Sequence, residues 1–167
     1  VGDTGSVSVV NTSNMSGDKA LSLPATSGVE VTTDSDYGIG TIFEMDIRPE
    51  GDSITGVQFG KEDGSNYFEV VLDSGNNNFG IAEIVNDAED RSNTNNTEIA
   101  IDETVHLTIE WSLYGDHRAT LYEDESKTTE IDSVFLENDG EVNRNTGSLG
   151  LVSKDDTATT LVDEIAV

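Results

Sequence analysis

Apolar and polar residues alternate along most of this chain with a period of two residues, and that pattern limits the folds that the chain can adopt. From Phe43 to Arg48 apolar and charged residues alternate strictly, and apolar and polar residues do so from Val105 to Leu113. Successive side chains of a β-strand point to opposite faces, so this period predicts strands with one apolar face and one polar face. No segment sustains a helical period over about ten residues. The chain is therefore expected to be all-β.

Clusters of Gly, Asn, Asp and Ser separate the alternating segments, as in Asp73-Ser74-Gly75-Asn76. Such residues suit the tight turns of antiparallel hairpins. The expected strands are Val7–Val10, Ala20–Leu23, Val29–Thr32, Thr41–Arg48, Thr55–Lys61, Tyr67–Asp73, Gly80–Val85, Val105–Leu113, Arg118–Glu123, Glu130–Phe135, Ser148–Val152 and Leu161–Val167. The polar, Asn-rich segment Asn86–Thr97 is expected to be a long mobile loop. Residues 1–167 are thus predicted to form a single two-sheet antiparallel β-sandwich domain.

The charge of the chain restricts its partners and its environment. Asp and Glu number 34 against eight Lys and Arg, which gives a net charge of −26. Nucleic acid and anionic membranes would be repelled, because the basic residues form no patch. A compact state with this charge repels itself in dilute buffer, whereas molar salt shortens the Debye length to about 3 Å. A halophilic source is expected; intrinsic disorder is the alternative, which the regular alternation opposes.

Several smaller features restrict the class of protein, and two of them, the glycosylation sequons and the first residue, favour export. The chain contains no cysteine, which excludes disulfides and cysteine-based zinc sites. Glycosylation sequons begin at Asn11, Asn14 and Asn95. No apolar run approaches the roughly 20 residues of a membrane span. Because the sequence starts at Val1, we expect a processed chain or a piece of a larger extracellular protein, at a cell surface or in a virion.

Several of the alternating segments resemble a known family. The segments are Phe43–Arg48, Gly56–Gly60, Tyr67–Val70, Leu107–Trp111, Ala119–Asp124, Gly147–Leu151 and Val162–Val167. Together they resemble the concanavalin A-like and laminin G-like jelly-roll domains of archaeal surface proteins. The resemblance implies a jelly roll with one concave sheet on which such domains bind glycans. It covers about Ala20 to Val167 and includes no catalytic signature.

The resemblance places a set of polar-face residues on neighbouring strands of that concave sheet. Tyr67 and Tyr122 are expected to stack on a sugar ring, because both lie on polar strand faces. The expected hydrogen-bonding partners are Gln58, Glu69, His106, Glu110 and Arg118. Trp111 is in phase with Leu107, Ile109 and Leu113, so it is expected in the core instead. His117 is placed in a turn with no identified partner.

Calcium is the one cofactor that the resemblance suggests. Family members often tie the terminal strand to an N-terminal loop through one ion, and Ca²⁺ prefers oxygen ligands. Asp163 matches the acid of the terminal strand, and Asp18 is its expected partner. The ion would be structural.

The function expected from the sequence is a non-catalytic carbohydrate-binding or adhesion module, with a glycan or a glycosylated surface protein as partner. One alternative is a structural jelly-roll domain of a capsid, spike or cell-surface assembly, with protein–protein contacts only. A second is a divergent glycoside hydrolase, since Glu44-x-Asp46 could place two acids on one strand face. Arg48 and Pro49 occupy the positions at which a third acid would continue that motif.

Folding should depend steeply on salt, because ions screen the repulsion within a chain of net charge −26. Thermal melts followed by circular dichroism should show the melting temperature rising from dilute buffer to about 3 M KCl. A melting temperature that does not change with salt would contradict the expectation of a halophilic source.

Overall fold

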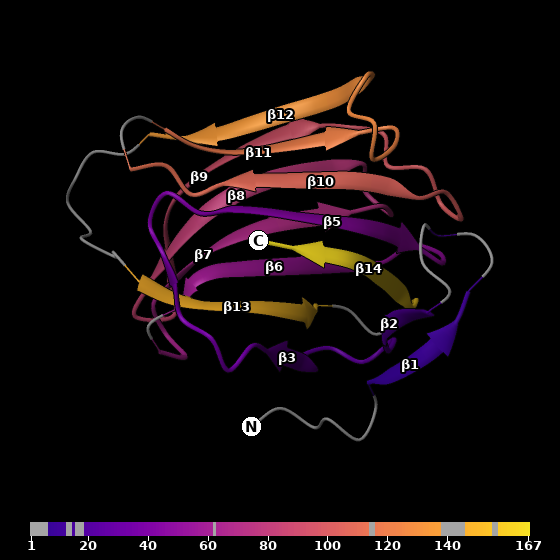
Figure 1. The fold of residues 1–167 in the computed structure, drawn as a ribbon, viewed down its shortest axis with the longest axis horizontal. Helices are drawn as coiled ribbons and strands as arrows, with labels where there is room; N and C mark the ends of the chain where they lie inside the picture. Colours follow the sequence, from indigo (N-terminus) through magenta and orange to yellow (C-terminus); the bar gives the residue numbers. More distant parts are fainter. Residues whose placement is uncertain are drawn as a thin grey trace.

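The computed structural model describes residues 7–12, 15, 19–61, 63–113, 116–137, 146–154 and 157–167. Their regular elements are all strands, which form two antiparallel sheets of seven strands each, one behind the other (Figure 1). Sheet 1 has the order β1-β2-β14-β5-β10-β11-β12, and sheet 2 has the order β3-β13-β6-β7-β8-β9, with β4 paired to β13. The predicted two-sheet antiparallel β-sandwich is confirmed. The described residues include no helix able to cross a membrane.

The strand boundaries follow the alternating segments closely. Sheet 1 contains β1 (Ser8–Asn11), β2 (Lys19–Leu23), β5 (Ile42–Pro49), β10 (Val105–Glu110), β11 (His117–Tyr122), β12 (Glu130–Leu136) and β14 (Thr160–Ala166). Sheet 2 contains β3 (Glu30–Thr32), β4 (Tyr37–Gly38), β6 (Ile54–Lys61), β7 (Tyr67–Asp73), β8 (Asn78–Val85), β9 (Ala88–Asn96) and β13 (Thr146–Ser153). The alternation did not indicate β4 and β9.

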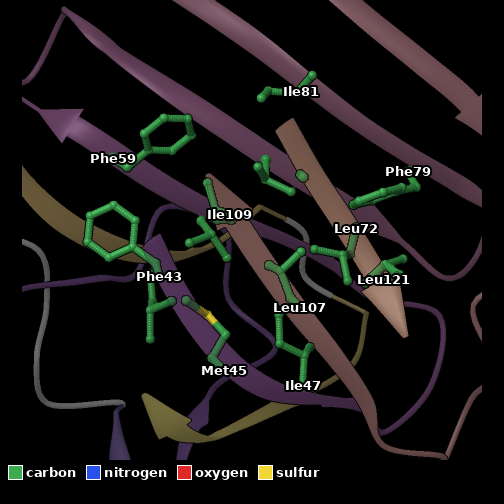
Figure 2. Close-up of a cluster of buried hydrophobic side chains, with 14 of the residues drawn as sticks. Phe43, Met45, Ile47, Phe59, Leu72, Phe79, Ile81, Leu107, Ile109 and Leu121 are labelled. Atoms are coloured by element: carbon green, nitrogen blue, oxygen red, sulfur yellow. The ribbon is translucent and has the colours of Figure 1, made fainter. Parts of the chain in front are cut away.

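One apolar layer fills the space between the sheets. It joins Phe43, Met45 and Ile47 of β5 and Leu107 and Ile109 of β10 to Phe59 of β6, Leu72 of β7 and Phe79 and Ile81 of β8 (Figure 2). Burying a large apolar side chain stabilises a fold by about 1.5–3 kcal/mol. Trp111 is 0% exposed, with its ring centroid 6.1 Å from that of Phe59, which confirms its expected place in the core.

The expectation of a loop at Asn86–Thr97 is wrong, because Ala88–Asn96 forms the edge strand β9. Its alternate side chains bond to the backbone of β12, the edge strand of the opposite sheet. Asn93 Nδ2 donates to the carbonyl oxygen of Phe135 at 2.9 Å, and Asn95 Nδ2 donates to that of Ser133 at 3.1 Å. Arg91 Nη1 donates to a third carbonyl, that of Glu137, which directly follows this strand.

These contacts explain how a strand whose one apolar residue is Ala88 is held in place. Its amides and guanidinium satisfy carbonyl groups that an edge strand would otherwise leave unpaired, and an unpaired edge invites aggregation. One of these contacts involves Asn95, the first residue of a sequon, so its side-chain amide is already hydrogen-bonded. Asn95 Nδ2 also donates to Asp132 Oδ1 at 3.0 Å, and the Thr97 hydroxyl donates to Asp132 Oδ2. Of the other sequon positions, Asn11 is exposed on β1, and Asn14 lies outside the described residues.

His117 lies inside the sandwich, not in a turn. It begins β11 and is 2% exposed, with its ring centroid 4.6 Å from that of Phe68 and 6.5 Å from that of Phe59. Burial lowers the pKa of His117 from 6.5 to about 4; the positive charge of Arg91 adds to this and the charge of Asp116 opposes it. The imidazole is therefore neutral in the folded protein at pH 7.

The neutral state of His117 predicts a loss of stability in mild acid. The folded pKa is about 4 and the unfolded pKa about 6.5. The contribution of neutral His117 to the free energy of unfolding is therefore fully present above pH 6.5 and is lost as the pH falls toward 4. A shift of this size is worth up to about 3 kcal/mol. Replacing His117 with Phe should remove this part of the pH dependence, as measured by denaturant unfolding in high salt. If wild type and variant differ by a constant free energy across this range, His117 does not titrate as described.

Candidate functional site

The structure divides the predicted ligand-binding residues between two sheets. Gln58, Tyr67 and Glu69 lie on β6 and β7 of sheet 2, whereas His106, Glu110, Arg118 and Tyr122 lie on β10 and β11 of sheet 1. Each group points outward from its own sheet, so the two groups face opposite sides of the sandwich. The expectation that all of them share one sheet is wrong. Alternation identifies the polar face of a strand, but it does not say to which sheet the strand belongs.

The sheet 2 group belongs to a larger set of polar side chains on that outer face. We call this set the sheet 2 cluster: Glu30, Gln58, Lys61, Tyr67, Glu69 and Lys154. Lys61 forms an ion pair with Glu30, and its Nζ donates to Gln58 Oε1 at 2.9 Å. Gln58 Nε2 donates to Glu69 Oε1 at 3.2 Å, and Lys154 Nζ bonds to the other oxygen of Glu69. An unbroken chain of charged and polar groups therefore joins β3, β6 and β7 to Lys154, which directly follows β13.

Glycine creates room for the buried carboxylate of this cluster. Glu69 is only 2% exposed, so its charge needs both the Gln58 amide and the Lys154 ammonium. A Cβ at Gly56 would lie 2.6 Å from Glu69 Oε1 and 2.6 Å from Val152 Cγ1. Any larger residue at this position would force Glu69, Val152 or both to shift.

Lys61 reaches the outer face through a bulge that alternation could not predict. Counting by twos from Phe59, which is buried in the core, would turn Lys61 inward as well. Gly60, however, adopts a positive φ of 58°, and the register between β6 and β13 shifts at this point. The extra residue returns Lys61 to the face of Gln58. A Cβ at Gly60 would also lie 2.8 Å from the indole of Trp111.

A hollow of about 190 Å³ opens beside the cluster. It is lined by Ser27, Gly28, Gln58, Tyr67, Glu69, Val152, Ser153 and Lys154. The ring of Tyr67 is half-buried, with the Nζ of Lys61 at 5.6 Å from its centroid. Burial raises the pKa of Tyr67, and the negative charges of Glu69, Asp87 and Glu30 raise it further. The phenol is therefore a neutral hydrogen-bond donor at pH 7. Lys154 keeps 37% of its side chain exposed at the rim.

Sequence reasoning missed Glu30, Lys61 and Lys154, three members of the cluster. Lys61 and Lys154 are two of only eight basic residues in the chain. Two cations on one face of such an acidic protein indicate a candidate site. The sequence does not reveal that they share a face, because it does not show that β6 and β13 are neighbours.

In the sheet 1 group, His106 is held by a buried contact with Asp46. His106 Nδ1 lies 2.8 Å from Asp46 Oδ1, and His106 is only 5% exposed. Register pairs Tyr122 with His106 and Arg118 with Glu110, so these four residues do share one face. Lys127, from the segment between β11 and β12, reaches across to pair with Glu44.

The two acids of the hydrolase motif are therefore both occupied. Glu44 pairs with Lys127, and Asp46 contacts His106 and is 2% exposed. A glycosidase needs one carboxyl group that is protonated and one that is free to attack or to activate water. Asp46 is too buried to reach a substrate, and Glu44 would have to release Lys127 before it could act in either role.

The calcium expectation stays a prediction. Asp163 is half-buried on β14, opposite Asp46 of β5, and Asp18 lies outside the described residues. Within the described parts of the chain, no group of at least three His, Cys, Asp or Glu side chains could hold a metal ion. The N-terminal segment that would complete an ion site with Asp163 is not among them.

Comparison with known proteins identifies the fold only. No protein-family model matches the sequence, and no curated protein matches it. Among solved structures, the carbohydrate-binding module CBM66 from Bacillus subtilis superimposes with a TM-score of 0.67 at 15% identity, covering 95% of this chain and 89% of that one. Galectin-Ib from Xenopus laevis gives 0.59 at 13% identity, covering 81% and 96%. A toad ovary galectin in complex with thio-digalactose gives 0.55 at 18% identity, covering 81% and 98%. This chain shares the jelly-roll β-sandwich fold of these proteins.

Proposed function

We propose that this protein is a non-catalytic carbohydrate-binding module and that it binds a glycan at the outer face of sheet 2. The observation that carries the proposal is the hollow between Tyr67 and Lys154, where an aromatic ring lies beside a network of charged hydrogen-bonding groups. Two proteins of the same fold are named as a carbohydrate-binding module and a galectin, which supports this choice. We further propose an extracellular role in adhesion, at a halophilic cell surface or on a virion, toward glycans or glycosylated surface proteins.

The chemistry of the hollow suits a sugar. Tyr67 offers a half-buried ring against which the C–H face of a pyranose can stack, and its neutral hydroxyl can donate to a sugar oxygen. Lys154 uses one donor for Glu69 and keeps others for the ligand. Because Gln58 and Glu69 are already fixed by their mutual hydrogen bond, the polar groups need little reordering on binding.

A binding role also agrees with the ion pairing of the carboxylates on both outer faces. In the sheet 2 cluster Glu30 and Glu69 are paired with Lys61 and Lys154, and on sheet 1 Glu44 is paired with Lys127. We therefore propose that the protein does not hydrolyse glycans. Release of reducing ends by purified protein, abolished in Glu44→Gln, would support the divergent hydrolase instead.

Exposed apolar residues favour the structural alternative. Phe135 is 52% exposed and Ile42 is 49% exposed on the outer face of sheet 1. Register places them at the two ends of one row, separated by Glu110 and Arg118. A protein partner of a capsid, spike or cell-surface assembly could cover this row. The finding that would select this function is the absence of any glycan ligand.

Two tyrosines, one on each sheet, make a matched pair for testing the proposal. A glycan identified on an array in about 3 M KCl, where charge repulsion is screened, would be titrated by calorimetry. Tyr67→Ala should weaken binding at least about tenfold, because losing a stacked ring costs about 1.4 kcal/mol or more. Tyr122→Ala, on the outer face of sheet 1, should leave the affinity unchanged.

Two results would contradict the proposal. Unchanged affinity in Tyr67→Ala, with the fold confirmed by circular dichroism, would place the site elsewhere. If the wild type binds no glycan, the structural alternative stands. Affinities in the range of about 10⁻³ to 10⁻⁵ M are expected for one stacked ring and a few hydrogen bonds.

A further inference from the structure

A second hollow lies on the opposite side of the molecule, on the outer face of sheet 1. It measures about 320 Å³ and is lined by Val10, Asn11, Thr12, Ser22, Arg48, Glu50 and Leu161. Register pairs Leu161 of β14 with Ser22 of β2 on one side and with Arg48 of β5 on the other. These residues therefore form a row across three neighbouring strands, with an apolar residue between a hydroxyl and a guanidinium. Side chains on paired strands are well suited to hold a ligand in a fixed geometry.

Arg48 of this hollow is largely buried but only loosely paired. Its side chain is only 15% exposed, yet its ion pair within the described residues is a single long contact, 3.9 Å from Nη2 to Asp102 Oδ1. Four other basic residues are paired more closely: Lys61, Arg91, Lys127 and Lys154 each hydrogen-bond a carboxylate. A guanidinium has five donor hydrogens, so Arg48 retains donors that can serve a ligand in the hollow.

We infer that this hollow is a second saccharide site and that it takes a neutral sugar. Arg48 donates hydrogen bonds to sugar oxygens, and Glu50, two residues further on, accepts them from sugar hydroxyls. Leu161 provides an apolar floor for the C–H face of the ring. The net charge of −26 and the nearby Asp102 and Glu50 disfavour an anionic ligand. The choice of ligand class rests on the function proposed for sheet 2.

Two sites on opposite outer faces make the protein bivalent. Because the sheets pack through their inner faces, the hollow at Arg48 and the hollow at Tyr67 open in opposite directions. One molecule can then connect two glycan chains that a single site could only bind separately. Such bridging suits an adhesion module, since linked sites gain avidity without new contacts.

The test is a titration of ¹⁵N-labelled protein with neutral monosaccharides, followed by amide chemical shifts in high salt. The probes are D-glucose, D-galactose, D-mannose and D-fructose at up to about 100 mM, because a single ring is expected to bind in the millimolar range. At least one sugar should shift two separate sets of amides, around Ser22 and Leu161 and around Gln58 and Lys154. D-glucuronate should bind at the Arg48 hollow, which the first set of amides reports, more weakly than the neutral sugars do.

Matched variants assign each set of shifts. Arg48→Met, which keeps the aliphatic stem, should raise the dissociation constant at the first set at least about tenfold and leave the second set unchanged. Glu50→Ala, at an exposed position, should weaken the first set similarly without touching the sheet. Arg118→Met, which removes an exposed arginine from the same outer face, should change neither set.

Each outcome decides between the two sites. Shifts confined to the Gln58 and Lys154 set, or unaffected by Arg48→Met and Glu50→Ala, would overturn the second site and leave the proposed function intact. Preference of the first set for D-glucuronate would overturn the neutral ligand class. Shifts at neither set would overturn the second site and the proposed function together.

Discussion

The apolar layer between the two sheets is the constraint on which the rest of the structure depends. Because side chains alternate across each strand, a slip of one residue in β5 or β10 would turn its whole apolar set outward. Burial of Phe43, Phe59 and Trp111 therefore fixes the register of strands that are far apart in sequence. The same register sends the polar residues of those strands to two outer faces that point in opposite directions. The candidate sites are thus a direct consequence of how the core is packed.

Polar contacts complete the structure where the apolar layer does not reach. The edges β9 and β12 meet through Asn93 and Asn95, whose amides bond backbone carbonyl groups across the gap between the sheets. On the outer face of sheet 2, Glu69 is buried only because Gly56 leaves it space and Lys154 neutralises it. In a chain of net charge −26, such close pairing uses several of the few cations to neutralise particular carboxylates.

Sequence reasoning reached the fold class and most strand boundaries, because alternation reports directly on half-buried strands. It failed where position is set by contacts remote in sequence. Segment 88–96 has no apolar residue after Ala88, so alternation could not identify it as a strand, and its contacts with the carbonyl groups of β12 became apparent only in the structure. His117 looked like a turn residue, although it packs on Phe68 in the core. The site was recovered in part: Gln58, Tyr67 and Glu69 do lie together, whereas the bulge at Gly60 that adds Lys61 has no signal in the alternation.

The central claim is that a glycan binds on the outer face of sheet 2, and a crystal structure of the complex tests it most directly. Crystals grown in high salt would be soaked with the oligosaccharide that binds best in solution. The account predicts density for a sugar ring stacked on Tyr67, with a hydroxyl within hydrogen-bonding distance of Lys154 Nζ. Well-defined sugar density elsewhere on the molecule, with the hollow between Tyr67 and Lys154 holding only solvent, would contradict it.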